Sequence, residues 1–440
     1  LLSARRRTHR IPLLFFFSSA TAAASSSSAQ PPSMPPMPAS AVLDSDAITS
    51  AMPDAAASSL SSTYKRAVFS DVDGTLAHYP KNLQGVGSID DGEEGLIYLP
   101  PSKTGTRGVI SARTLRLCHE LRHGDAAARA SSSDEDDEGG TTAISERKKR
   151  INGGGVPFVL VSGMRTTTLF QRLPYLPRAD AYVCESGGRI FYPLPVLRED
   201  ASREDAAEGA VEGLVVRPAA YPGMPPSDGT PFSLVEDMRW RNQISRPDAA
   251  GPDGYDDDCP LERRRGKLWD FARALSRKGY VLDKSGYAAA FRINRRHQND
   301  NLASTFDDFV EKCAEREGIP EGLGCSTNLG CVDVYPATSG KKNCAEYLVR
   351  RFLGGDGDAK GTISLQTHAF CMCDDDNDVE MALACRAAYL PSVASDGVRR
   401  LVDSRNDGRL TVTEDAEGGV VGPPATEAAL EAIMGELRSP

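Results

Sequence analysis

The chain has 440 residues, more than one ordinary domain needs, so two structural units are the first expectation. Hydrophobic residues make up 40% and charged residues 25%, which is typical of a globular protein. The net charge is −10 and no long basic stretch interrupts it, which argues against a nucleic-acid partner. No apolar run approaches the roughly 18–20 residues that a membrane span needs, which argues against a membrane partner.

Residues 1–62 are predicted to be a disordered leader. Four arginines lie within the first ten residues, and sequence rich in Ser, Ala and Pro follows, with no acidic residue before Asp44. This composition resembles an organellar transit peptide, although the apolar run 11–17 followed by small residues also resembles a short secretory signal. The ten cysteines include no CxxC pair, which favours a reducing compartment. We therefore expect the cytoplasm, or a plastid or mitochondrion if the leader is a transit peptide.

Apolar runs alternate with amphipathic stretches along the rest of the chain. A helix capped by Ser111 is expected after the first strand, and another over 166–173. Strands separated by helices are typical of a parallel, doubly wound sheet. The predicted fold class is therefore α/β, with a Rossmann-like core. The core strands are expected at 67–70, 156–161, 181–184, 368–373 and 387–390.

The pattern changes between about 190 and 336. Residues 200–258 are rich in Gly, Pro and acidic residues, and helices at 262–277 and 306–316 then alternate with strands at 287–294 and 330–335. This predicts an α+β domain inserted into the sheet domain. The expected division is a leader 1–62, a first core part 63–189 containing a disordered insertion 124–155, a cap 190–336, and a second core part 337–440.

Two carboxylates, Asp71 and Asp73, follow the first apolar strand. Gly74 allows the chain to turn so that both face one point. Their repulsion is costly unless a cation is present or one of them is protonated. A metal-bound carboxylate can attack phosphorus, and a protonated one can donate to a leaving oxygen. The alternative is a polar turn without chemistry.

A second acidic stretch, 374–378, also follows an apolar strand. Its carboxylates form a candidate site for a hard cation, and a helical turn would place Asp374 and Asp378 on one face. Ser162 ends a third strand and can donate to a phosphoryl oxygen, while Lys341 opens a predicted helix and can offset negative charge. Read alone, the acidic stretch could be a solvated turn.

These four sequence features (the two aspartates after the first strand, Ser162, Lys341 and the acidic stretch), in this order along the chain, resemble the motifs of the haloacid-dehalogenase-like (HAD) hydrolase superfamily. Asp71-Val72-Asp73-Gly74-Thr75 matches its first motif, Val161-Ser162-Gly163-Met164-Arg165 its Ser/Thr motif, Lys341 its lysine, and Asp374 through Asp378 its acidic motif. The α+β segment between the second and third motifs resembles the large cap of the Cof-like and sucrose-phosphate-phosphatase-like subgroup. The resemblance covers roughly residues 65–440.

The resemblance implies a phosphatase that acts on a small phosphorylated metabolite, with a sugar phosphate as the first candidate. Asp71 would attack phosphorus and form an aspartyl-phosphate. Asp73 would protonate the leaving oxygen and then activate water. Ser162 and Lys341 would hold the phosphoryl oxygens, although Lys342 stays an alternative to Lys341.

The cofactor implied by the resemblance is Mg²⁺. Its ligands would be Asp71, Asp73 through its backbone carbonyl, and Asp374. Asp378 would either bind the ion directly or contact one of these ligands. One departure from the family pattern is Cys373, which stands where glycine is usual. Further contacts to the substrate phosphate would come from Gly74, Thr75, Gly163, Arg165 and Asn377.

Two other functions stay open at this point. A transferase or mutase of the same fold would pass the phosphoryl group to a sugar hydroxyl, and a catalytically silent relative would only bind the phosphometabolite. The segment 403–414 resembles a calcium loop, but Arg405 occupies a ligand position and a strand is expected at 410–413, which disfavours calcium. Arg292, Arg295 and Arg296 could bind an anionic substrate group or be surface charges.

Overall fold

We analysed a computed structural model of the chain. The predicted leader lies outside the residues that it describes, as does the predicted insertion 124–155 apart from Gly124 and residues 154–155. Within the described residues no helix combines the length and apolarity needed to cross a membrane. The described residues are 64–79, 95–101, 107–124, 154–195, 210–244, 259–299, 306–312, 318–328, 330–354, 362–405, 408–413 and 422–439.

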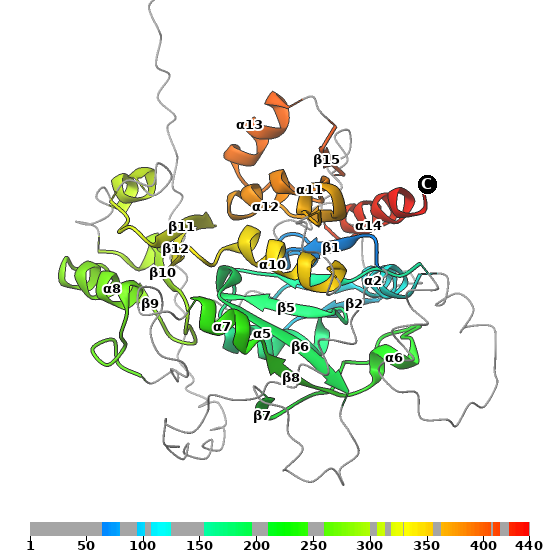
Figure 1. The fold of residues 1–440 in the computed structure, drawn as a ribbon, viewed down its shortest axis with the longest axis horizontal. Helices are drawn as coiled ribbons and strands as arrows, with labels where there is room; N and C mark the ends of the chain where they lie inside the picture. Colours follow the sequence, from blue (N-terminus) through cyan, green and yellow to red (C-terminus); the bar gives the residue numbers. More distant parts are fainter. Residues whose placement is uncertain are drawn as a thin grey trace, which may run out of the picture. The chain divides into compact units, whose positions relative to one another are not determined.

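A nine-stranded sheet with the order β15-β14-β13-β1-β4-β5-β6-β8-β7 forms the core (Figure 1). The strands from β15 to β5 in this order pair in parallel. The α/β fold class is thus confirmed, and β1 lies between the strands that precede the Ser/Thr motif and the acidic motif. The parallel strands are β1 (Ala67–Ser70), β4 (Phe158–Val161), β5 (Ala181–Cys184), β13 (Ala369–Met372), β14 (Ala387–Leu390) and β15 (Leu410–Val412).

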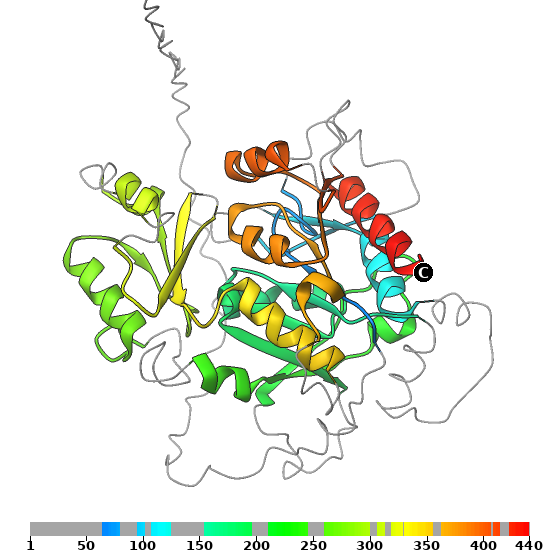
Figure 2. The same cartoon turned by 45° about the horizontal axis from the view of Figure 1, so that its top comes forward.

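Alternate residues of these strands belong to two separate hydrophobic cores. Val68 of β1 belongs to the core that includes Leu115 of α2 (Ala112–His123) and Ile433 of α14 (Pro423–Arg438). These two helices lie side by side (Figures 1 and 2). Phe69 belongs instead to the core that includes Leu348 of α10 (Lys341–Leu353). Because successive strand residues point to opposite faces, helices cover both sides of β1.

The first part of the predicted cap continues the core sheet instead. Three strands, β6 (Arg189–Pro195), β8 (Phe232–Glu236) and β7 (Ala210–Val216), add to β5 in antiparallel order. The core sheet thus continues past residue 190, where the cap was expected to begin. Pro193 and Pro195 lie within β6, where proline weakens the sequence signal of a strand, and a register shift interrupts the pairing of β7 with β8.

A second sheet is antiparallel throughout and has the order β11-β12-β10-β9. Alternate residues of β10 are buried, so Phe291 and Ile293 join the core while Arg292 lies on the other face. Helix α8 (Lys267–Arg277) adds Leu268 and Trp269 to the same core. This sheet consists of β9 (Leu282–Asp283), β10 (Phe291–Asn294), β11 (Leu323–Asn328) and β12 (Cys331–Pro336).

The remaining elements connect or cover these two sheets, and two short strands among them pair as a third, antiparallel sheet. Helix α5 (Thr166–Arg172) follows β4 directly, and η6 (Asp376–Asp378) with α12 (Val379–Ala384) follows β13. Residues 306–312 are helical, within the helix expected at 306–316. The others are β2 (Leu96–Tyr98), β3 (Val109–Ser111), η2 (Leu173–Tyr175), η3 (Glu185–Gly187), α6 (Pro226–Gly229), α7 (Met238–Ile244), η5 (Arg295–His297), α11 (Leu365–His368) and α13 (Asp396–Ser404).

Candidate functional site

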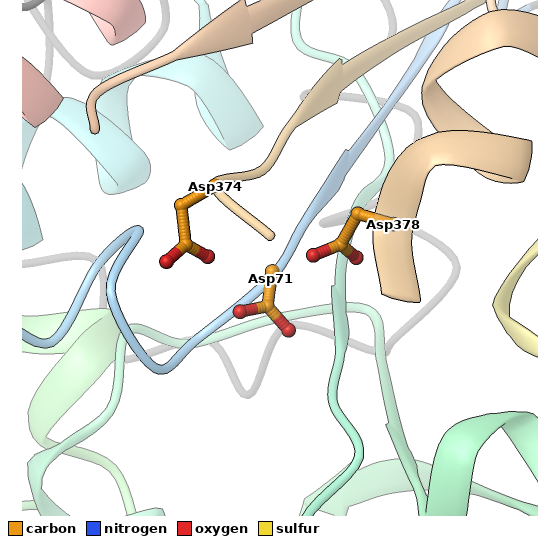
Figure 3. Close-up of side chains that lie close together, drawn as sticks. All are labelled: Asp71, Asp374 and Asp378. Atoms are coloured by element: carbon orange, nitrogen blue, oxygen red, sulfur yellow. The ribbon is translucent and has the colours of Figure 1, made fainter. Parts of the chain in front are cut away.

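Three buried carboxylates converge at the carboxyl end of the parallel strands. Asp71 follows β1, Asp374 lies two residues beyond the end of β13, and Asp378 ends η6 (Figure 3). The Asp71 backbone N–H donates to the Met372 carbonyl at 2.9 Å, which joins the two strand ends. One oxygen from each carboxylate lies within 4.8 Å of the others. In a doubly wound sheet, ligands bind at this edge, where the strand order reverses.

The electrostatics of this cluster call for a cation. Burial raises the pKa of Asp71 to about 8, although Lys341 acts in the opposite direction, and burial also raises the pKa of Asp374 and Asp378. Asp378 is fully buried, and its Oδ2 has no hydrogen-bond partner. A divalent cation would satisfy this oxygen and stabilise all three ionised carboxylates. The all-oxygen donor set fits a hard cation such as Mg²⁺.

The Lys341 ammonium lies within the cluster. Its Nζ donates to Asp71 Oδ1 at 2.7 Å, to Asp378 Oδ1 at 2.7 Å and to Asn377 Oδ1 at 3.3 Å. Lys342 is 41% exposed in its side chain and lies 3.9 Å from Glu346 instead. Of the two candidate lysines, Lys341 is therefore the one that contacts Asp71, whereas Lys342 pairs with Glu346.

The turn after β1 is shaped by its contact with Asp374. Gly74 has φ +89°, and a Cβ atom there would lie 2.0 Å from Asp374 Oδ2. Only glycine fits, because the backbone is left-handed and the carboxylate occupies the space of a side chain. The Thr75 hydroxyl donates to Asp374 Oδ1 at 3.1 Å, and Ser392 donates to the Gly74 carbonyl at 3.0 Å. In this structure Thr75 thus orients a carboxylate.

The Ser/Thr motif lies at the end of the strand next to β1. Ser162 is buried, and its Oγ accepts from the Met164 backbone N–H at 3.1 Å. Gly163 is also buried, in the same turn. β4 pairs in parallel with β1, so Ser162 and Asp71 lie at the same edge of the sheet. A phosphoryl group bound at Asp71 would therefore have the Ser162 turn beside it.

Arg165, for which a phosphate contact was predicted, contacts residues near the second sheet. Its guanidinium donates to both oxygens of Asp283, at 3.1 and 2.5 Å, and to the Ser285 carbonyl at 2.7 Å. Asp283 belongs to β9, so this arginine links the core to the second sheet. The sequence could not reveal the link, because its partner lies 118 residues away.

The Asp73 carboxylate is not one of the three clustered carboxylates, although its charge acts on Asp71. Its Oδ1 accepts from Arg172 Nη1 at 2.6 Å and from the Tyr79 hydroxyl. Although burial acts against it, the interaction with Arg172 and Tyr79 holds the pKa of Asp73 below its usual value. The sequence reading missed Arg172 and Tyr79. Arg172 lies in the helix that begins after the Ser/Thr motif, and this was the only hint of its role.

Two acids that extend the acidic motif are used locally. Asp375 Oδ1 accepts from the Asp376 backbone N–H at 2.8 Å, and Asp376 Oδ1 accepts from the Ser395 hydroxyl at 2.6 Å. Asp375 and Asp376 thus help to shape the turn between Asp374 and Asp378.

Of the arginines on the second sheet, Arg292 forms a two-bond pair with Asp333, at 2.5 and 2.7 Å.

A left-handed turn after β5 joins the core to the second sheet. Glu185 and Ser186 both have φ near +54°, which is costly for residues other than glycine. Glu185 Oε2 accepts from the backbone N–H groups of Ala288 and Ala289, at 2.9 and 2.6 Å. The Ser186 N–H donates to the Ser162 carbonyl at 3.2 Å. The turn therefore contacts both the Ser/Thr motif and the segment that leads into β10.

No family model and no curated protein matches this chain. Among solved structures, the sucrose-phosphatase from Synechocystis, in complex with sucrose and phosphate, is similar, with 12% identity and a TM-score of 0.43; the match covers 85% of this chain and 98% of that one. A trehalose-6-phosphate phosphatase from Aspergillus fumigatus has 13% identity and a TM-score of 0.35, covering 84% and 92%.

A sugar phosphatase of HAD subclass IIB is also similar, with 13% identity, a TM-score of 0.37, and coverage of 84% of this chain and 98% of that one. These structural neighbours are phosphatases of the superfamily that the four motifs resemble. The identities are too low to carry an activity over to this chain, so the case for a function lies in the geometry of the site.

Proposed function

We propose that the chain is a Mg²⁺-dependent phosphatase of the HAD type that hydrolyses a small phosphorylated metabolite, with Asp71 as its nucleophile. The observation that carries this proposal is the contact of Lys341 with both Asp71 and Asp378, inside a cluster of three buried carboxylates. A buried lysine among three acids leaves a net negative site. Such a site suits a divalent cation together with a phosphate ester.

The metal ion would be held by Asp71, Asp374 and Asp378, and would neutralise charge on the phosphoryl oxygens and on the attacking carboxylate. Whether the backbone carbonyl of Asp73 is a further ligand stays a prediction. Lys341 holds Asp71 Oδ1, which orients the carboxylate at the strand end. Positioning and charge neutralisation are the main sources of catalysis in phosphoryl transfer.

The proposed reaction has two steps. First, an Asp71 oxygen forms a bond to phosphorus, the ester bond breaks, and the leaving oxygen takes a proton from Asp73, which has to bind that proton from solvent beforehand because its pKa lies below the usual value. Then Asp73 accepts a proton from water, whose oxygen attacks the phosphorus of the aspartyl-phosphate. Inorganic phosphate departs and the Asp71 carboxylate is restored. Ser162 and the Lys341 ammonium would hold the phosphoryl oxygens during both steps.

The second sheet is the proposed cap, reduced to residues 259–336. Its links to the core, through Arg165 with Asp283 and through Glu185 with Ala288 and Ala289, keep it beside the catalytic edge. A cap in this place would exclude bulk water and select the substrate. A sugar phosphate stays the first substrate class to test.

The test is hydrolysis of p-nitrophenyl phosphate and of a panel of sugar phosphates with Mg²⁺ present. Asp71→Asn is expected to lower turnover by at least about 10³-fold while the circular dichroism spectrum is unchanged. The matched control is Asp270→Asn, since Asp270 is an exposed residue of α8; it should keep full activity. Retained turnover in Asp71→Asn would remove Asp71 as nucleophile.

The same assay separates the two rival functions. A transferase would form a new phosphate ester when an acceptor sugar is added, whereas a phosphatase releases inorganic phosphate at an unchanged rate. A silent binding protein would bind phosphate esters without turning over any of them. Release of inorganic phosphate by the wild-type chain contradicts a silent binding protein, and an unchanged rate of release with the acceptor sugar present contradicts a transferase.

A further inference from the structure

A cavity of about 550 Å³ lies between α7 and α10, outside the catalytic edge (Figure 1). Neither Lys341 nor any of the three clustered carboxylates lines it. Its volume is in the range of pockets that hold small molecules. The residues that the argument uses are Arg239 and Trp240 of α7, and Glu346, Tyr347, Arg350 and Arg351 of α10.

The charged side chains that line this cavity are mostly cations. Three of them are guanidinium groups, and Glu346 supplies the one carboxylate. The charge of Glu346 is already offset, because its Oε1 lies 3.9 Å from Lys342 Nζ. The whole chain carries a net charge of −10, so a cavity lined mainly by arginines runs against the general trend. A concave surface of one sign attracts small ions of the other sign, which here are anions.

Two of the three arginines have no anionic partner among the described residues. Arg351 Nε lies 3.7 Å from Asp237 Oδ2, whereas the exposed Arg239 and Arg350 form no hydrogen bond or ion pair with a described residue. The helix dipole favours cations in the last turn of α10, where Arg350 lies. Arg239 lies instead in the first turn of α7, where the dipole disfavours a cation. Its position therefore calls for a different reason.

The base of the cavity holds the two helices in a fixed arrangement. The rings of Trp240 and Tyr347 pack with centroids 5.0 Å apart. Trp240 is 2% exposed and its Nε1 donates to the Gly187 carbonyl at 2.9 Å, while the Tyr347 hydroxyl donates to Asp237 Oδ2 at 2.9 Å. Arg239 precedes Trp240, and Arg350 lies one helical turn after Tyr347. Both arginines therefore start from fixed backbone positions on two sides of one cavity, which lowers the cost of binding a ligand between them.

We propose that this cavity is a second binding site for a phosphate group, held by Arg239 and Arg350. The planar fork of a guanidinium matches two oxygens of a phosphate with parallel hydrogen bonds, and two arginines together balance the charge of a dianion. The ligand is inorganic phosphate or the phosphate monoester of a small metabolite. The site needs no metal ion and takes no part in the proposed hydrolysis, so it does not depend on the proposed function.

The test is calorimetric titration of inorganic phosphate into the full chain in the presence of EDTA. Without a divalent cation, the three clustered carboxylates exceed the charge of Lys341 and repel phosphate, so binding reports on the cavity. The wild type is expected to bind at a single site. Arg239→Gln and Arg350→Gln should each raise Kd at least about 10-fold, because each removes a charged hydrogen-bond donor. Added KCl should weaken the binding to the wild type.

The matched control is Arg400→Gln, since Arg400 is an exposed arginine of α13 that does not line the cavity. Its Kd should stay within about twofold of the wild-type value. All three substituted arginines are exposed, so the circular dichroism spectra of the variants should match that of the wild type.

The two sources of the phosphate group are distinguished by titrating sugar phosphates and the parent sugars under the same conditions. A Kd at least about 10-fold lower for a sugar phosphate than for inorganic phosphate identifies a phosphate monoester as the ligand, and the reverse order identifies inorganic phosphate. In both cases the arginine variants should weaken binding, and the parent sugar should not bind.

Phosphate binding that requires Mg²⁺, or that is equally tight in the wild type, Arg239→Gln and Arg350→Gln, would place the anion elsewhere and overturn the proposal. Absence of binding by every phosphate probe, or equal binding of a sugar and its phosphate, would also overturn it. The measurement does not involve turnover, so a chain without phosphatase activity would leave this result unchanged.

Discussion

Lys341 is the residue on which the charge balance of the site depends. It is 4% exposed and donates to Asp71 and Asp378, which are themselves buried. Lys341→Gln keeps a hydrogen-bond donor but removes the charge, so it should lower kcat/KM for p-nitrophenyl phosphate by at least about 100-fold. Lys342→Gln is the matched control, since Lys342 is half exposed, and it should keep more than about half of the activity. Similar losses in both variants would contradict the assignment.

His78 gives a pH prediction that is independent of catalysis. Burial lowers its pKa from 6.5 to about 4, and its Nε2 lies 2.7 Å from the Thr426 hydroxyl. The unfolded chain binds a proton near pH 6.5 and the folded chain only near pH 4. The contribution of His78 to the free energy of unfolding is therefore largest above pH 6.5. About 3 kcal/mol of this contribution is lost as the pH falls to 4.

Urea unfolding of the wild type and of His78→Gln at several pH values checks this. Glutamine can keep a hydrogen bond to Thr426 but does not titrate. The free energy of unfolding of the wild type should fall more steeply between pH 6.5 and 4 than that of the variant. Parallel curves would show that His78 binds its proton at the same pH in the folded and the unfolded chain.

Which residues of the site could be predicted depended on whether they stand at the start or end of an expected element. Asp71 and Asp374 each closely follow an apolar strand and Lys341 opens a helix, so all three could be placed at one sheet edge although Lys341 lies 270 positions from Asp71. The partner of Arg165 could not be predicted, since nothing in the sequence marks Asp283 as its ion-pair partner. Arg172 was missed for the same reason, because it lies at the end of α5 and outside the four motifs.

At the scale of elements, buried parallel strands were predicted well and antiparallel additions poorly. β5 and β14 match their predicted bounds because each is a short apolar run. β6 contains two prolines, and the pairing of β7 with β8 is irregular, so neither shows a clean alternation of apolar residues. This sheet therefore continues past the last parallel strand and beyond residue 190, where the cap was expected to begin.

The turn of η3 gives a prediction at the same scale, because it connects two elements through one side chain. Glu185 is fully buried and accepts from the N–H groups of Ala288 and Ala289. Glu185→Ala would leave both N–H groups without an acceptor, so it should destabilise the fold by about 2–4 kcal/mol in urea unfolding. Glu185→Gln retains one acceptor oxygen and should cost clearly less. Equal costs would mean that the two hydrogen bonds contribute little.

The whole molecule is expected to be stabilised by the metal ion that the site is proposed to bind. Asp71, Asp374 and Asp378 come from β1, from the turn after β13 and from η6, so a shared ion would tie these segments together. A ligand that binds only the folded state adds about 2.7 kcal/mol of stability when its concentration is 100 times Kd. Mg²⁺ should therefore raise the melting temperature of chelator-treated protein, in the absence of any substrate.

The size of this shift in a site variant identifies the residues responsible. Asp374→Asn removes one charged ligand and should abolish most of the Mg²⁺-induced shift in melting temperature. With Asp374 gone, only two carboxylates remain beside the positive charge of Lys341, and this weakly negative site should no longer attract a hard cation. The matched control is Asp376→Asn, whose carboxylate accepts from Ser395 and lies outside the cluster of three; it should keep most of the shift. A shift of the same size in both variants would place the ion elsewhere. If the melting temperature of the wild type does not shift at Mg²⁺ concentrations that support turnover, the acidic cluster does not bind Mg²⁺.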